Sequence, residues 1–157
     1  DKLYEKRTVK TYDTGFKDPI TAKKKRGVKT ASDIAANPLR SDIEAIIRIG
    51  VRGLEVNADG TFDPAGLVNR GPYAMMIEDI LIKVTGDEKL ATKFIGSTST
   101  FPDLRSDLPY FNAVMVVTSR GIMKGDLATG QFNPEGPVSG VDALLIIKDF
   151  RDQLNFR

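Results

Sequence analysis

The 157-residue chain contains no cysteine, no histidine and no tryptophan. These absences exclude disulfides, thiolate and imidazole metal ligands, cysteine nucleophiles and every catalytic triad that needs histidine. No stretch approaches the ~20 consecutive apolar residues that a membrane-spanning helix requires. The sequence therefore predicts no metal site, no cofactor and no transmembrane segment in this chain.

The acidic residues also lack the arrangement that hydrolysis or calcium binding needs. The pairs Glu78/Asp79 and Asp87/Glu88 are sequence neighbours, which predicts solvated surfaces rather than two carboxyls facing each other across a cleft. Residues 57–63 superficially resemble a calcium loop, but they lack the full alternation of oxygen ligands and the closing glutamate. We therefore expect that the protein is not an enzyme.

Charge is distributed unevenly along the chain. Residues 1–30 contain ten Lys and Arg against four Asp and Glu, whereas the remaining residues contain thirteen against seventeen. Such a run predicts a basic, poorly structured lead-in over residues 1–30, which we expect to act as a tether. The alternative is direct binding of anionic lipid, wall polymer or nucleic acid by this arm, since charge alone attracts any polyanion. For the protein as a whole we predict no nucleic-acid partner.

The chain repeats itself after the basic lead-in. Residues 59–64 (Asp-Gly-Thr-Phe-Asp-Pro) return at 129–134 as Thr-Gly-Gln-Phe-Asn-Pro, a displacement of 70. Two further matches are Asp33-Ile34 with Asp103-Leu104 and, after a one-residue adjustment, Gly50-Val51 with Gly121-Ile122. A fixed displacement of this kind indicates an internal duplication. It predicts repeat 1 over residues 31–95 and repeat 2 over residues 96–157.

Apolar residues recur at helical spacing inside each repeat. A stripe that predicts one helix face consists of Tyr73, Met76, Ile77, Ile80, Leu81 and Val84. The residues 70 positions later form the same stripe, except that Arg151 stands where the first stripe has an apolar residue, Leu81. A shorter apolar segment precedes each long helix and ends before Gly50 or Gly121, because glycine enters the left-handed conformation cheaply. The predicted fold is all-α, with tandem helix–loop–helix repeats packed as one helical bundle.

Two local features test this helical interpretation. Residues 114–117 are β-branched enough to favour a strand by propensity, but the counterpart segment at 43–49 has helical spacing, so we predict a helix. Ser139, followed three residues later by Asp142, resembles a capping box at a helix start. Asn69 occupies the equivalent cap position in repeat 1.

The order of these features resembles the S-layer homology (SLH) domain. Repeat 2 contains Phe101-Pro102-Asp103, Gly121-Ile122, Gly125, Gly130-Gln131-Phe132-Asn133-Pro134 and Ser139-Gly140-Val141-Asp142. Repeat 1 contains Ala31-Ser32-Asp33, Gly50-Val51, Gly53, Gly60-Thr61-Phe62-Asp63-Pro64 and Asn69-Arg70-Gly71-Pro72. The resemblance extends over roughly residues 31–152. The Gly-x-Phe-x-Pro loop and the preceding Gly-Ile are its most specific parts.

The resemblance implies a helical bundle, typically of three repeats, that attaches noncovalently to an acidic, peptidoglycan-linked wall polysaccharide. In that family the long helix opens with Thr-Arg-Ala-Glu, and its arginine and nearby loop glycines lie in grooves between repeats. Here Arg70 keeps the arginine, whereas Gly140 replaces it in repeat 2, and a third repeat is not evident. The glycan-binding residues expected from the resemblance and the local chemistry are Arg70, Asn69, Gly53, Gly125, Ser139 and Tyr110.

Arg70 is the leading candidate because a guanidinium at a helix N-terminus can hold a carboxylate bidentately, assisted by backbone N–H groups. The alternative is a surface arginine paired with Asp63 or Glu78. Phe62 and Phe132 are predicted to be core anchors of their loops rather than ligand-stacking rings. The loop glycines are predicted to satisfy backbone geometry.

The sequence thus predicts a non-enzymatic binding or anchoring module of a bacterial cell envelope, with wall polysaccharide or peptidoglycan as partner. The alternative is a protein–protein or self-association module that has lost glycan binding, with a second copy or another envelope protein as partner. The resemblance implies an extracytoplasmic location in the bacterial cell envelope, either the periplasm or the cell surface. The chain begins at Asp1 rather than Met, so we expect a mature or trimmed chain from which a signal peptide has been removed.

Overall fold

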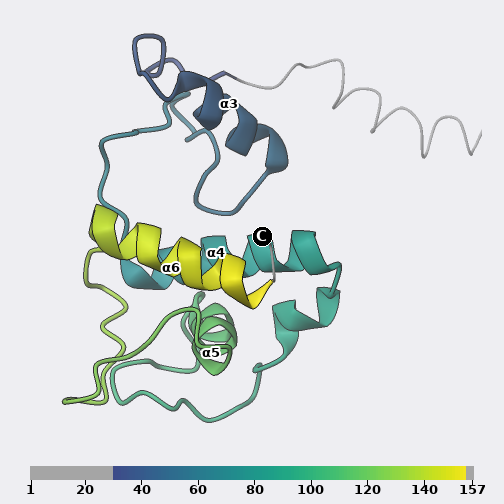
Figure 1. Ribbon diagram of the computed structural model, residues 1–157, viewed down its shortest axis with the longest axis vertical. Coiled ribbons are helices and arrows are strands. Elements are labelled where there is room, and N and C mark those ends of the chain that lie inside the picture. The colour runs from purple at the N-terminus through teal and green to yellow at the C-terminus, as the bar shows by residue number, and fades with distance from the viewer. Residues whose placement is uncertain (1–29, 155–157) are drawn as a thin grey trace, which may run out of the picture. The chain divides into compact units, whose positions relative to one another are not determined.

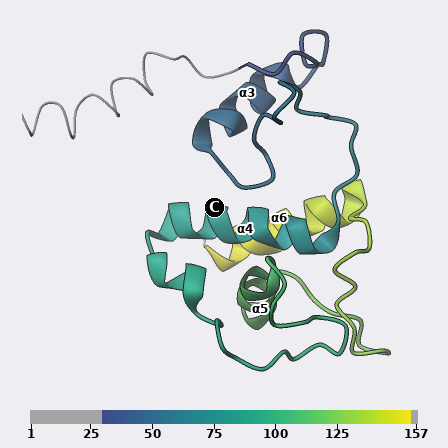
Figure 2. The same cartoon turned by 180° about the vertical axis from the view of Figure 1, so that it is seen from behind.

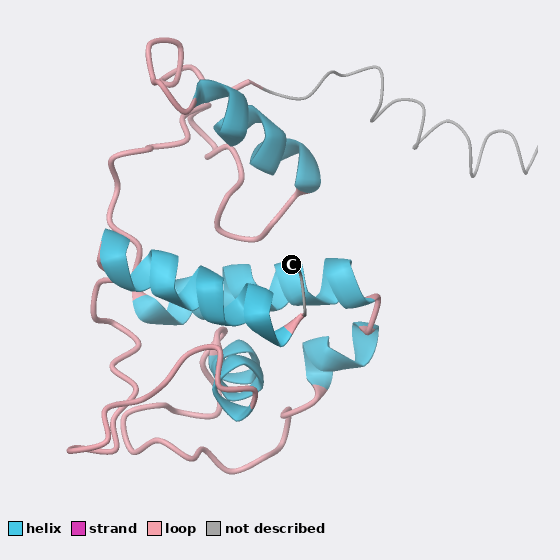
Figure 3. Ribbon diagram, in the orientation of Figure 1, coloured by secondary structure: helices cyan, strands magenta, loops and turns pink. Residues whose placement is uncertain are grey.

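The computed structural model describes residues 30–154, and within this range the chain forms helices, turns and loops (Figure 1). The helices are α3 (Arg40–Ile49), α4 (Arg70–Thr85), the 3-10 helix η2 (Glu88–Thr92), α5 (Phe111–Ser119) and α6 (Gly140–Gln153). No strand occurs among these residues, as Figure 3 shows, so the all-α prediction is confirmed. The predicted basic lead-in lies outside the described residues except for Thr30.

The described residues divide into two compact units. The first contains residues 30–49 and 56–62, and the second contains residues 50–55 and 63–154. The first unit has a small core around α3, formed by Ala31, Ile34 and Ile43, with Ile47, Val56 and Phe62 packed against it. Phe62 is thus a core anchor of its loop, as predicted.

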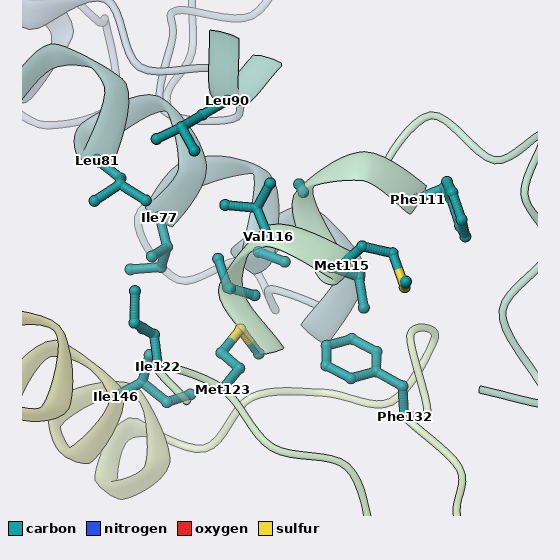
Figure 4. Packing of buried hydrophobic residues seen from close by; sticks show 14 of the residues in the cluster. Ile77, Leu81, Leu90, Phe111, Met115, Val116, Ile122, Met123, Phe132 and Ile146 are labelled. Carbon is teal, nitrogen blue, oxygen red and sulfur yellow. The ribbon is translucent and has the colours of Figure 1, made fainter. Parts of the chain in front are cut away.

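The second unit is built around α4, which packs against both α5 and η2. Figures 1 and 2 show α4 running alongside α6, and the Tyr73 hydroxyl of α4 donates to the Ala143 carbonyl of α6 at 2.9 Å. Side chains from all four helices converge on one interior (Figure 4). The largest fully buried ones in this unit are Leu81, Val114, Val116, Val117, Ile122, Met123 and Phe132. Val51, from residues 50–55, is also fully buried.

Helix α5 contains the β-branched segment 114–117, so the prediction of a helix there is confirmed. Val114, Val116 and Val117 are all fully buried. Because the segment is enclosed by apolar neighbours, burial outweighs the small preference of β-branched residues for strands. Phe111, at the start of α5, is 3% exposed and belongs to the core.

The two long helices begin in different ways. The Ser139 hydroxyl accepts a hydrogen bond from the Asp142 N–H at 3.1 Å, which confirms the predicted cap of α6. Asn69 is the N-cap residue of α4 but makes no side-chain cap bond. The first free N–H groups of α4 are satisfied by another loop, because Arg70 N donates to the Gly136 carbonyl at 2.9 Å and Gly71 N donates to Pro134 at 2.8 Å.

The duplicated loop has the same backbone conformation in both copies. Asp63 and Asn133 each have φ of 58°, and the glycines three residues before them, Gly60 and Gly130, have φ of 86° and 71°. An aspartate near the start of each repeat holds the loop of that repeat in the same manner. The Phe62 N–H donates to Asp33 Oδ1 at 2.8 Å, and the Phe132 N–H donates to Asp103 Oδ1 at 2.9 Å.

Candidate functional site

A surface pocket of about 520 Å³ lies within the second unit, at the start of α4 and the second copy of the duplicated loop. Its lining residues are Arg70, Lys124, Gly125, Asp126, Thr129, Gln131, Phe132 and Asn133. All of them except Arg70 come from residues 124–133, the loop that leads to α6. The pocket therefore joins a helix start from one part of the sequence to a loop from another.

Arg70 is fixed in this pocket by three contacts with the loop. Its Nε donates to the Phe132 carbonyl at 2.8 Å, and its Nη2 donates to the Lys124 carbonyl at 2.6 Å. Its guanidinium carbon lies 4.5 Å from the centre of the Phe132 ring, a cation–π distance. An arginine has five N–H donors, so three remain for a ligand after these two hydrogen bonds.

The electrostatics of the pocket favour an anion. Burial lowers the pKa of Arg70, and the more distant charges of Asp142 and Asp103 oppose this shift. Over residues 30–154, no carboxylate forms an ion pair with Arg70. The exposed Lys124 adds a second positive charge at the rim. Asp126 supplies one negative charge, but its Oδ1 accepts from the Ala128 N–H at 2.7 Å and so holds the loop.

The alternative partner considered for Arg70, Glu78, lies elsewhere in the unit. The prediction that Glu78 belongs to a solvated face was wrong, since this residue is only 2% exposed. Arg52 Nη2 donates to one oxygen of Glu78 at 2.6 Å, and Asn112 Nδ2 donates to the other at 2.7 Å. Arg52 also forms an ion pair with Asp79 at 2.7 Å. These partners come from residues 50–55 and from α5, so the sequence around Glu78 does not reveal them.

Gly125 lies in the pocket, but for a different reason from the one predicted. Its φ is not positive, unlike that of Gly53 at 84°. A Cβ atom on Gly125 would lie 2.6 Å from Cε1 of Phe101 and 3.0 Å from the Gln131 carbonyl oxygen. Crowding by the neighbouring ring and backbone therefore requires glycine at this position.

Tyr110 lies beside the start of α4 without lining the pocket. A Cβ on Gly71 would meet the Tyr110 ring at 2.9 Å, so the ring covers that glycine. The Tyr110 hydroxyl donates to Glu135 Oε1 at 2.5 Å. Burial, and then the hydrogen bond and charge of Glu135, raise the pKa of Tyr110 to about 12.

The remaining predicted site residues are also outside the pocket lining. Asn69 precedes Arg70 and forms an isolated backbone bridge with Pro137. The Ser139 hydroxyl is engaged in its helix cap, and a Cβ on Gly53 would lie 2.8 Å from Met76 Cε. The structure thus brings Arg70 and Gly125 together in one pocket. It adds Lys124, Asp126, Thr129, Gln131 and Asn133, of which Gln131 and Asn133 belong to the Gly-x-Phe-x-Pro loop that the sequence singles out.

No helix between residues 30 and 154 is long and apolar enough to span a membrane. The same residues contain no group of three or more His, Cys, Asp or Glu side chains placed to hold a metal ion.

Residues 100–144 match the family model of the S-layer homology domain, which confirms the resemblance for this part of the chain. The matched segment includes α5, the whole 124–133 loop and the beginning of α6. No curated protein and no solved structure matches the chain. S-layer homology domains are binding modules associated with the cell envelope, and residues 100–144 are the part of this chain that is similar to one.

Proposed function

From the S-layer homology domain at residues 100–144, we propose that this protein attaches noncovalently to an acidic, peptidoglycan-linked polysaccharide of the bacterial cell wall. The observation that carries the proposal is Arg70, a half-buried guanidinium without a carboxylate partner among the described residues, in a pocket of about 520 Å³. Burial of a charge is unfavourable unless a counter-charge and hydrogen bonds compensate for it. An anionic ligand would supply both.

The chemistry of the pocket suits a carboxylate or phosphate attached to a sugar. The free N–H groups of Arg70 can bind two oxygens of such an anion side by side. Lys124 can approach from the rim, where its flexible side chain tolerates different ligand shapes. The side chains of Gln131, Thr129 and Asn133 offer donors and acceptors for sugar hydroxyls.

The proposal extends to the organisation of the chain. Residues 31–95 and 96–157 would be two copies of one repeat, with Arg70 of the first copy completing a pocket made by the loop of the second. Residues 1–30 would be a basic tether, and the protein would act outside the cytoplasm. Asn69, Ser139 and Tyr110 would shape the surroundings of this pocket rather than touch the sugar. Gly53, which packs against Met76, would have a structural role.

Sedimentation with purified cell-wall sacculi tests the proposal. We expect the protein to co-sediment with sacculi that retain their acidic polysaccharides and to remain in solution with sacculi from which these polymers have been stripped. Added salt should release it, because the interaction depends on exposed charges. Equal retention on intact and stripped sacculi, or no retention at low salt, would contradict the proposal.

Lys124→Glu is the informative variant, because the exposed Lys124 side chain makes no hydrogen bond or ion pair within the part of the chain that the structure describes. It should reduce retention without changing the thermal unfolding temperature. Lys83→Glu, on the exposed end of α4, is the matched control and should bind like the wild type. Arg70→Ala removes both the charge and the contacts to the loop, so it should lower binding and stability together.

A further inference from the structure

Helix α6 carries an apolar stripe that no described part of the second unit covers. Val141, Leu144 and Leu145 are 70%, 69% and 54% exposed. They lie at helical positions i, i+3 and i+4, and Lys148 follows at i+7 on the same face. Three large apolar side chains in one stripe are more than the single exposed residues that ordinary surfaces show.

The equivalent stripe on α4 is covered by a short helix. A displacement of 70 relates Val141, Leu144 and Lys148 to Gly71, Ala74 and Glu78. All three of these α4 residues are buried. Helix α5 and the residue before it cover them, since the Tyr110 ring lies on Gly71 and Asn112 donates to Glu78. One copy of the long helix therefore has its short-helix partner, whereas the same face of the other copy is open.

A matching stripe exists on α3, the short helix of the first unit. It consists of Asp42, Ala45, Ile46 and Ile49, at helical positions i, i+3, i+4 and i+7. Ile46 is half-buried and the other three are exposed. Both stripes contain one charged and three apolar side chains over the same length of helix. The charged residue comes first in the α3 stripe and last in the α6 stripe. An antiparallel pair would place Asp42 opposite Lys148 and Ile49 opposite Val141. Neither Asp42 nor Lys148 takes part in an ion pair within residues 30–154.

We infer that the Val141/Leu144/Leu145/Lys148 face of α6 is a self-association surface that binds α3 of a second copy of this chain. The apolar residues supply the burial, and the pairing of Asp42 with Lys148 sets the antiparallel direction. Each copy carries one α3 and one α6, so two copies satisfy both stripes and form a closed dimer. This inference is independent of the glycan site, because none of the stripe residues lines the Arg70 pocket.

Light scattering coupled to size exclusion measures the assembly. The wild-type chain should be a dimer that dissociates on dilution. Leu144→Asp should yield a monomer with an unchanged circular dichroism spectrum, because Leu144 lies on the surface. Leu127→Asp is the matched control, since Leu127 is fully exposed on a loop outside the stripe, and this variant should remain dimeric.

Charge reversal identifies the partner helix. Asp42→Lys and Lys148→Asp should each weaken the dimer by about tenfold or more, because like charges would then face each other at both interfaces. An equimolar mixture of the two variants should recover the dimer, since each interface in the mixed pair again joins opposite charges. A wild-type chain that is monomeric at all concentrations overturns the inference. So does a dimer that withstands Leu144→Asp, or a mixture of the two charge variants that stays monomeric.

Discussion

Asp103 holds the backbone of Phe132 in place, since its Oδ1 accepts the Phe132 N–H at 2.9 Å. Its second oxygen accepts the next N–H, that of Asn133, at 2.7 Å. Asn133 has φ of 58°, a conformation that non-glycine residues seldom adopt without support. One carboxylate therefore stabilises the strained part of the loop that forms the wall of the Arg70 pocket.

Asp103→Ala should lower the free energy of unfolding by about 2 kcal/mol, because two backbone donors lose a charged acceptor. Asp103→Asn should have a smaller effect, since it keeps one acceptor oxygen. Urea denaturation measures both. Asp107→Ala removes only an exposed ion pair with Arg105 and should change stability by less than about 1 kcal/mol. Equal effects of Asp103→Ala and Asp107→Ala would contradict this role of Asp103.

The helix caps provide a matched pair of substitutions. Ser139→Ala should destabilise the protein by about 1 kcal/mol, because the hydroxyl satisfies the Asp142 N–H at the start of α6. Asn69→Ala should have little effect, since its side chain makes no cap bond and the first N–H groups of α4 bond to Gly136 and Pro134. The midpoints of chemical denaturation compare the two. A larger loss for Asn69→Ala would show that the caps have been assigned wrongly.

The pKa of Tyr110 should depend on the presence of Glu135. Burial, followed by the hydrogen bond and the charge of Glu135, raises the pKa of Tyr110 from 10.0 to about 12. Glu135→Gln removes the charge and should move the pKa of Tyr110 back toward 10. Ultraviolet absorbance titration detects the change. A Tyr73→Phe background is needed, because burial also raises the pKa of Tyr73 to about 12.

The same titration has a consequence for stability. A phenol whose folded-state pKa is raised ionises first in the unfolded chain, so stability falls as pH rises from about 10 to about 12. Glu135→Gln should reduce this fall. An identical loss of stability with and without Glu135 would exclude the carboxylate as a cause of the shift.

The contribution of Glu78 to stability should change with pH in the direction opposite to that of an ordinary paired carboxylate. Burial raises the pKa of Glu78 above its usual value of 4.5, although hydrogen bonds from Arg52 and Asn112 act against this. The folded protein therefore holds this proton more tightly than the unfolded chain. The contribution of Glu78 to stability should fall as pH rises from about 4.5 through the raised pKa.

Comparison of the wild type with Glu78→Gln measures the effect of removing this ionisable group, since every other titrating residue is present in both proteins. The difference in unfolding free energy, wild type minus variant, should decrease as pH rises. Arg52→Met should raise the pKa of Glu78 further, since it removes a hydrogen bond that favours the charged form. If the wild-type minus Glu78→Gln difference in unfolding free energy grew with pH, it would contradict a raised pKa of Glu78.

The local and repeated features of this protein follow from its sequence. The helical spacing of apolar residues predicted α4, and the displacement of 70 marked the two loops that the structure shows with the same backbone conformation. The sequence also predicted the Ser139 cap and the helical conformation of residues 114–117. These features depend on residues a few positions apart, so a linear pattern contains them.

The tertiary structure alone decided the surroundings of the charged groups. Arg70 donates to the carbonyl oxygens of Lys124 and Phe132. Every residue has a backbone oxygen, so the residue types in the sequence do not show which of these oxygens Arg70 will contact. Glu78 is buried because Arg52 and Asn112, from distant segments, meet its carboxylate. Charge placement depends on which segments fold beside one another, and the energy of burying a charge is set by those neighbours rather than by the residue itself.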